Sequence, residues 1–150
     1  MAANSLREQL ILDVKSSLES ISSIAHVDRR KLSFDELETV PATQLPYVVV
    51  MGDLPIPKYK FEGRSSASIG AVISELTINL TVYGSERENP DSAISSLLDD
   101  IWVKMFEDPT RSGLAIKTTL YPSPKYAILD PYYAFEVDVI VTYKHTTNSI

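Results

Sequence analysis

Cysteine is absent from the 150-residue sequence. A chain without thiols has no disulfide framework, no thiolate nucleophile and no cysteine ligands for zinc. This composition is compatible with folding in a reducing compartment, so we expect a protein made and folded in the cytosol. Long apolar runs are missing too: Arg7, Glu8 and Asp13 interrupt the start of the chain, and no run approaches the ~20 residues of a membrane-spanning helix.

Histidine and glycine are scarce. The two histidines, His26 and His145, form no spaced pair of metal ligands. The five glycines form none of the patterns that cradle phosphates or present a catalytic serine. Asp99 and Asp100 are adjacent, and adjacent helical side chains point about 100° apart rather than toward one substrate atom. The sequence therefore predicts no catalytic residue, no metal site and no cofactor.

Positive charge is in deficit, with 14 Lys and Arg against 20 Asp and Glu and a net charge of -6. This balance disfavours general affinity for nucleic acid, because phosphate binding depends on clustered cations. It still allows an acidic wall along which DNA slides without sticking. The length and the 44% hydrophobic content predict one domain, residues 1–150, with an ordinary buried core.

Two segments have the pattern of amphipathic helices. In the first, Ser5 and Glu8 form a capping box, which predicts a helix start. Its apolar stripe comprises Leu6, Leu10, Val14, Leu18 and Ile21. The second helix is predicted to begin near Pro90 and to stop at Asp108. Its broad apolar stripe comprises Ile94, Leu97, Leu98, Ile101, Trp102, Met105 and Phe106.

Five segments predict strands, the first of them a short one from Ile24 to Arg29 that soon turns polar. Residues 45–53 contain a continuous apolar run typical of a strand buried on both faces. Residues 76–82 and 135–143 alternate apolar and polar side chains, as expected for strands with one solvated face. Residues 114–121 predict a further strand, followed by a turn rich in proline (Pro122, Pro124 and Pro131), and the tail from His145 is expected to fray. The element order predicts an α+β fold: a mainly antiparallel mixed sheet with two amphipathic helices packed on one face.

Residues 54–68 stand out as a candidate contact region. Long connections within compact domains are often functional. Cations and aromatics interleave here in Lys58, Tyr59, Lys60, Phe61 and Arg64. Such interleaving also suits nucleic-acid stacking, although Glu62 and the acidic chain favour protein contact. The segment is either a loop or projecting hairpin arm that contacts a partner, or a plain edge strand with exposed lysines.

Two apolar residues lie on the wrong faces of their predicted helices. Leu12 lies away from the stripe of the first helix, and Val103 points opposite Leu98 and Met105 on the second. Each is either an ordinary exposed apolar residue or part of a contact with a neighbouring subunit.

The order of these elements resembles the tail-terminator and tail-completion proteins of long-tailed bacteriophages. The likeness is carried by the opening helix (residues 6–21), the proline-led strand from Leu45 to Val50, the strand and helix around Pro90, and the closing strand that ends in V-x-Y at Tyr143. It spans nearly the whole chain but rests on pattern, without a single diagnostic motif.

The resemblance implies a structural virion protein rather than an enzyme. Such proteins form a ring, usually of six subunits, on the last ring of the tail tube, where they stop tube growth and join the tail to the head connector. We would then expect assembly in the host cytoplasm, a final location in the virion tail, and DNA passing through the lumen without specific binding.

Two alternatives remain open. One is a neck or head–tail joining protein of the same virus type. The other is a small-ligand-binding protein or enzyme, which a cleft with perturbed carboxylates near Tyr132 or Tyr133 would favour. For the assembly function, we expect the 54–68 segment to contact the sheet edge of a neighbouring copy, because head-to-tail interfaces close into rings and an extended segment can add a strand.

Overall fold

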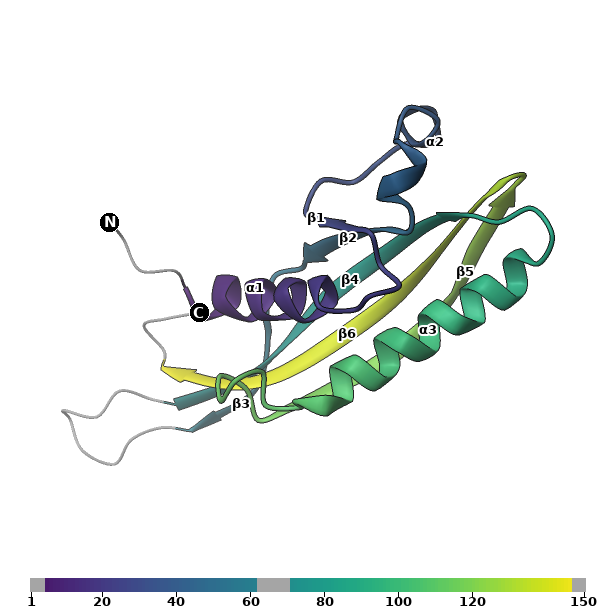
Figure 1. The fold of residues 1–150 in the computed structure, drawn as a ribbon. Coiled ribbons are helices and arrows are strands. Elements are labelled where there is room, and N and C mark those ends of the chain that lie inside the picture. The colour runs from purple at the N-terminus through teal and green to yellow at the C-terminus, as the bar shows by residue number, and fades with distance from the viewer. Residues whose placement is uncertain (1–4, 62–70, 147–150) are drawn as a thin grey trace.

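The computed structural model describes residues 5–61 and 71–146. The three helices of this part of the chain are α1 (Leu6–Glu19), α2 (Phe34–Leu37) and α3 (Pro90–Glu107), and a short 3-10 helix spans Ala42–Gln44. The strands are β1 (His26–Asp28), β2 (Tyr47–Gly52), β3 (Ile56–Phe61), β4 (Ala71–Ser85), β5 (Lys117–Leu129) and β6 (Tyr132–Thr146), as Figure 1 shows.

The strands form one six-stranded sheet in the order β1-β2-β4-β6-β5, with β3 also paired to β4. The β1–β2 pair is parallel, and the other pairs are antiparallel. The two central strands, β4 and β6, each have 15 residues and pair along their whole length. The predicted mainly antiparallel mixed sheet is therefore confirmed.

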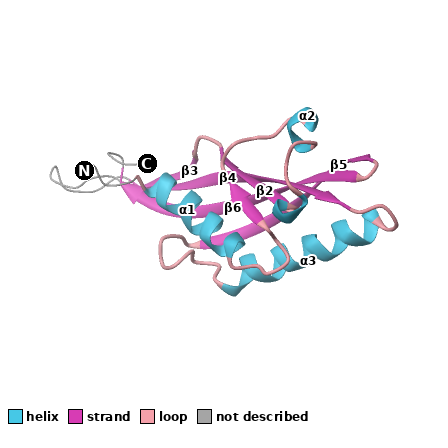
Figure 2. Ribbon diagram, turned by 45° about the horizontal axis from the view of Figure 1, so that its top comes forward, coloured by secondary structure: helices cyan, strands magenta, loops and turns pink. Residues whose placement is uncertain are grey.

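The helices α1 and α3 cover the same face of this sheet (Figures 1 and 2). Ser5 caps α1, because its Oγ accepts a hydrogen bond from the Glu8 backbone N–H at 3.1 Å. The buried residues of the two helices join the inward side chains of the strands in one core: Leu10, Ile11, Val14 and Leu18 from α1, and Leu97, Ile101 and Met105 from α3. The predicted α+β fold with two amphipathic helices on one face is confirmed.

The inward stripe of α3 is narrower than the sequence pattern indicates. Ile101 and Met105 are fully buried, whereas Trp102 and Phe106 are each 41% exposed. Each exposed aromatic follows a buried residue by one position, which turns it about 100° around the helix and away from the centre of the buried face. The prediction that both aromatics pack inward is therefore wrong.

A second, smaller core lies on the face of the sheet opposite α1 and α3. It contains Leu32, Leu37, Tyr47, Val49 and Tyr83, so α2 and its flanking segments cover this end of the sheet. Within β2, Val48 and Val50 belong to the main core while Tyr47 and Val49 belong to the second. The prediction of a strand buried on both faces is confirmed from Tyr47 to Val50.

The predicted proline-rich turn is partly wrong. Strand β5 continues past Tyr121 to Leu129, with a register shift between Pro122 and Tyr126, and the chain reverses only between Leu129 and Tyr132. Prolines fit here because β5 is an edge strand, where a missing backbone N–H costs little.

His145 was expected in a frayed tail, but it belongs to β6. It pairs with Val72 of β4. Its ring lies 5.2 Å from that of Tyr143 between centroids. Strand pairing therefore orders this part of the chain through Thr146.

Candidate functional site

Most large exposed hydrophobic side chains of the described residues lie along two opposite edges of the sheet. We define the β3 edge by Met51, Leu54 and Ile56, which are 45%, 81% and 57% exposed. We define the β5 edge by Ile116, Tyr121, Tyr126, Ile128 and Leu129, all about half exposed or more. The strand order places β3 on one side of the central β4–β6 pair and β5 on the other.

The β5 edge is also open along its backbone. β5 has 13 residues and pairs on one side only, with β6, among the described strands. An edge strand presents unpaired N–H and C=O groups that can pair with another chain. The β5 edge thus combines exposed apolar side chains with free backbone groups, the two components of a strand-addition interface.

Beside the β5 edge, α3 exposes an aromatic pair. The ring centroids of Trp102 and Phe106 lie 5.2 Å apart. A hydrogen bond of 2.6 Å joins Ser23 Oγ, in the segment after α1, to Asp100 of α3. Asp100 therefore lies on the side of α3 that faces α1. Trp102 follows Asp100 by two positions, or about 200° around the helix, so it faces away from α1.

Trp102 lines a shallow hollow that we call the α3 hollow. Its lining residues are Ser95, Leu98, Asp99 and Trp102, and its volume is about 360 Å³. Leu98 packs against the main core and supports the floor of the hollow. The Asp99 carboxylate has no ion-pair partner among the described residues. The hollow therefore presents one indole ring and one unpaired negative charge to solvent.

The structure places only some of the predicted contact residues. Lys58 is exposed on β3, and its Nζ lies 3.9 Å from Glu75 Oε2. The backbone of Tyr59, Lys60 and Phe61 completes β3, but their side chains, and all of Arg64, lie outside what the structure describes.

Leu12 and Val103 are 38% and 55% exposed, on α1 and α3 respectively. They lie on the outward faces of their helices, as the sequence pattern indicates. Their role in subunit contact stays a prediction.

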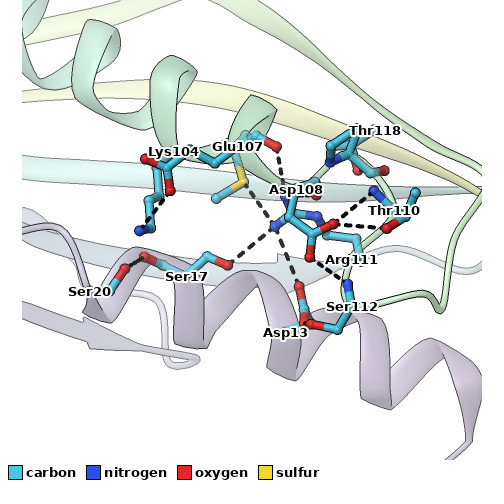
Figure 3. Close-up of polar contacts among 12 residues, drawn as sticks. Asp13, Ser17, Ser20, Lys104, Glu107, Asp108, Thr110, Arg111, Ser112 and Thr118 are labelled. Carbon is cyan, nitrogen blue, oxygen red and sulfur yellow. Dashed lines mark hydrogen bonds and ion pairs between the residues drawn. The ribbon is translucent and has the colours of Figure 1, made fainter.

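The most constrained polar cluster surrounds Arg111, which is fully buried (Figure 3). Its Nη2 donates to the carbonyl oxygens of Met105, at 2.6 Å, and Asp108. Its Nη1 donates to Ser17 Oγ at 3.3 Å and lies 3.4 Å from Asp13 Oδ1. Arg111 therefore neutralises the negative end of the α3 dipole and ties that end to α1.

The loop that carries Arg111 is held by Asp108. The Asp108 carboxylate accepts hydrogen bonds from the Ser112 N–H at 2.7 Å and the Thr110 hydroxyl at 2.9 Å, and these bonds lower its pKa. Arg111, Ser112 and Gly113 have φ values of 48°, 59° and 82°, a run of left-handed residues that is costly for the two that are not glycine. Apart from the buried Arg111 Nε, which has no hydrogen-bond partner among the described residues, the donors of this cluster bond acceptors of the chain itself, so we interpret the cluster as support for α3.

The lowered pKa of Asp108 predicts a pH dependence of stability. Because the folded pKa lies below the unfolded value of about 3.9, this carboxylate stabilises the fold above that value, and the contribution is lost as pH falls through the folded pKa. Asp108→Ala is expected to be less stable than the wild type at pH 6, with a difference that shrinks toward pH 2. Urea unfolding at several pH values measures it.

The control for this pH series is Ser96→Ala, which changes an exposed side chain without a titratable group. Its difference from the wild type should change less with pH. A constant difference for Asp108→Ala across the series would contradict the assigned role of the ionised carboxylate.

Two other polar clusters bear on the enzyme alternative. Tyr47 donates to Asp28 Oδ2 at 2.9 Å; burial, with this bond, raises the Tyr47 pKa to about 12. The Asp28 pKa is lowered, mainly by the Arg29 backbone N–H, so the pair consists of a neutral phenol and a stable carboxylate. Ser74 Oγ lies 2.7 Å from His145 Nε2, but Ser74 is only 1% exposed, so a substrate has no access to its hydroxyl.

Carboxylates do not converge around Tyr132 or Tyr133 in the described part of the chain either. A hollow of about 290 Å³ beside Tyr132 is lined also by Val40, Ala42, Leu45, Pro46 and Ser85, none of them acidic. Burial raises the Tyr133 pKa. Within residues 5–61 and 71–146, no group of three or more His, Asp or Glu side chains is placed to hold a metal ion.

No family model and no curated protein matches the sequence. In the part of the chain that the structure describes, none of the helices has the length and apolar character required to cross a membrane.

Proposed function

We propose that this protein is a structural subunit that assembles with copies of itself into a ring. The observation that supports this proposal most directly is the division of exposed apolar side chains between the unlike β3 and β5 edges. A contact between two unlike surfaces is heterologous. A copy that binds through one of these surfaces keeps the other one free to bind the next copy. Such a chain of contacts closes into a ring when the rotation per copy allows it.

We further propose that the ring caps the head-proximal end of a phage tail tube. The resemblance in element order suggests this role, in which the ring ends tube growth and joins the tail to the head connector. The acidic net charge of -6 fits a lumen through which DNA passes without binding. A neck protein would use similar surfaces but a different partner, so binding to isolated tail tubes separates the two functions.

Assembly is expected to depend on both edges. Deleting residues 58–64 removes four of the six residues of β3, and Tyr126→Glu with Ile128→Glu places charges on the β5 edge; we expect each change to leave a folded monomer. The physical reason is that each change disrupts one of the two complementary surfaces: the deletion removes most of the strand that holds Ile56 at the β3 edge, and the two glutamates charge the β5 edge. Light scattering after size exclusion, with negative-stain images of the protein alone and with tail tubes, measures the outcome.

Lys31→Glu, at an exposed position on the segment between β1 and α2, is the matched control and should assemble like the wild type. Circular dichroism establishes that the edge variants are folded. A wild type that stays monomeric at high concentration and does not bind tube ends would exclude the proposed function. Rings that form unchanged in both variants would exclude the two edges as the contact surfaces.

A further inference from the structure

The segment from Leu54 to Lys58 has the properties of a preformed ligand. Its sequence is Leu-Pro-Ile-Pro-Lys. The two prolines fix φ near −65° and hold the chain extended, so little conformational entropy remains to be lost on binding. Leu54 and Ile56 are 81% and 57% exposed, and Lys58 follows as an exposed cation, 3.9 Å from Glu75 Oε2 of the neighbouring β4. Two apolar side chains and one positive charge are thus displayed on a stiff backbone.

The α3 hollow has the complementary properties. Extended proline-containing segments commonly dock in grooves lined by aromatic side chains, which the Trp102 and Phe106 pair supplies. Asp99 lines the hollow beside Trp102 and offers a carboxylate to a cation. Charge is complementary over whole elements as well: α3 carries four acidic residues and one lysine, and β3 carries two lysines and no acid.

The two surfaces cannot meet within one molecule. The Leu54–Lys58 segment lies at the β3 edge, and the lining residues of the α3 hollow lie on the side of α3 toward β5, so that β4 and β6 separate the two surfaces. A contact between them therefore joins two copies of the chain, and it leaves a free segment on one copy and a free hollow on the other. This head-to-tail geometry is the one a ring requires.

We propose that the α3 hollow binds the Leu54–Lys58 segment of a second copy of this chain. Leu54 and Ile56 pack on Trp102 and Phe106, and Lys58 pairs with Asp99. This inference rests on the proposed self-assembly and adds the α3 hollow, beside the β5 edge, to the surfaces that would carry it. Trp102 is the central contact, because buried tryptophans dominate the binding energy of many interfaces.

The absence of native cysteine allows a direct test by disulfide cross-linking. Leu54→Cys is placed on the segment and Ser95→Cys on the rim of the hollow. Under mild oxidation the double variant should give a ladder of disulfide-linked oligomers, which collapses on reduction. A mixture of the two single variants should give a dimer that contains one of each. The matched control pairs Ser95→Cys with Lys31→Cys, at an exposed position on the segment between β1 and α2.

A charge exchange tests the ion pair separately. Asp99→Lys and Lys58→Glu should each raise the Kd for self-association by about tenfold, the order expected for loss of a close pair and creation of a like-charge contact. Their combination should restore the Kd to within a few-fold of the wild type. Analytical ultracentrifugation gives the Kd values. Trp102→Ala should weaken association by tenfold or more.

The outcomes separate this inference from the proposed function. Cross-linking no greater than in the control, in a wild type that still forms rings, would overturn the α3 hollow as the docking site and leave ring assembly standing. Charge variants that weaken association without mutual rescue would overturn the Lys58–Asp99 pair. A wild type that is monomeric alone and with tail tubes would overturn both proposals.

Discussion

Arg111→Ala is expected to lower the free energy of unfolding by about 3–5 kcal/mol, the cost of removing one partner from a buried charged cluster. The substitution leaves the Met105 carbonyl without its donor and the Asp13 carboxylate without its buried cation. It also opens a cavity between α1 and α3. Urea unfolding followed by circular dichroism measures the change.

Arg111→Lys retains the charge but cannot reproduce the forked donor geometry, so we expect a smaller loss. This variant keeps the prediction testable if Arg111→Ala does not fold. Arg87→Ala, an exposed arginine in the loop before α3, is the control and should change stability by no more than about 0.5 kcal/mol. A small loss at Arg111, similar to that at Arg87, would show that the buried cluster contributes little.

Gly52→Ala is expected to cost about 1–3 kcal/mol because the added methyl group overpacks the contact between β2 and α1. A Cβ at this position would lie 2.4 Å from Ile11 Cδ1 and 3.2 Å from Arg7 Nη2. The Arg7 group is itself bound to the Gly52 carbonyl at 2.7 Å, which limits its freedom to move. Thermal and urea unfolding measure the loss.

The double variant Gly52→Ala with Ile11→Val identifies the cause of this loss. Valine lacks the Cδ1 atom that the new methyl group would meet, and Ile11→Val alone should cost about 0.5–1.5 kcal/mol. The double variant should therefore be clearly more stable than the sum of the single losses predicts. Additive losses would mean that contact with Ile11 Cδ1 is not the source of the destabilisation.

Periodicity predicted the parts of the fold in which one face of an element is buried and the other solvated. The alternation of β4 and β6 follows that rule, as do Leu10, Val14 and Leu18 of α1, whereas the predicted stripe omitted the buried Ile11 and continued to Ile21, beyond the end of the helix at Glu19. The prolines of β5 misled the prediction because, in a sequence, proline usually indicates a turn. An edge strand tolerates proline, but whether a strand lies at an edge depends on the strand order of the folded sheet. Trp102 was predicted to face inward because it is hydrophobic. Its hydrophobicity does not reveal whether the sheet extends far enough beneath α3 to cover it.

The candidate site was only partly predictable. Interleaved cations and aromatics indicated the 54–68 segment, but the exposed side chains of α3 and β5 that we propose as its complement come together only when the chain is folded. Arg111 was missed entirely, because an arginine after a helix usually lies in solvent. The nearest signal is the sequence Asp108 to Gly113, which combines a side-chain acceptor with a glycine suited to a left-handed turn.

The full-length pairing of β4 with β6 has a kinetic consequence. The two strands are separated along the chain by α3 and β5, so their 15 pairs of facing residues are contacts of high sequence separation. Loop-closure entropy must be lost before these contacts form, which places the chain among slowly folding topologies. β6 follows every other described element, so during synthesis the backbone edge of β4 that pairs with β6 stays unpaired, and open to aggregation, until β6 leaves the ribosome.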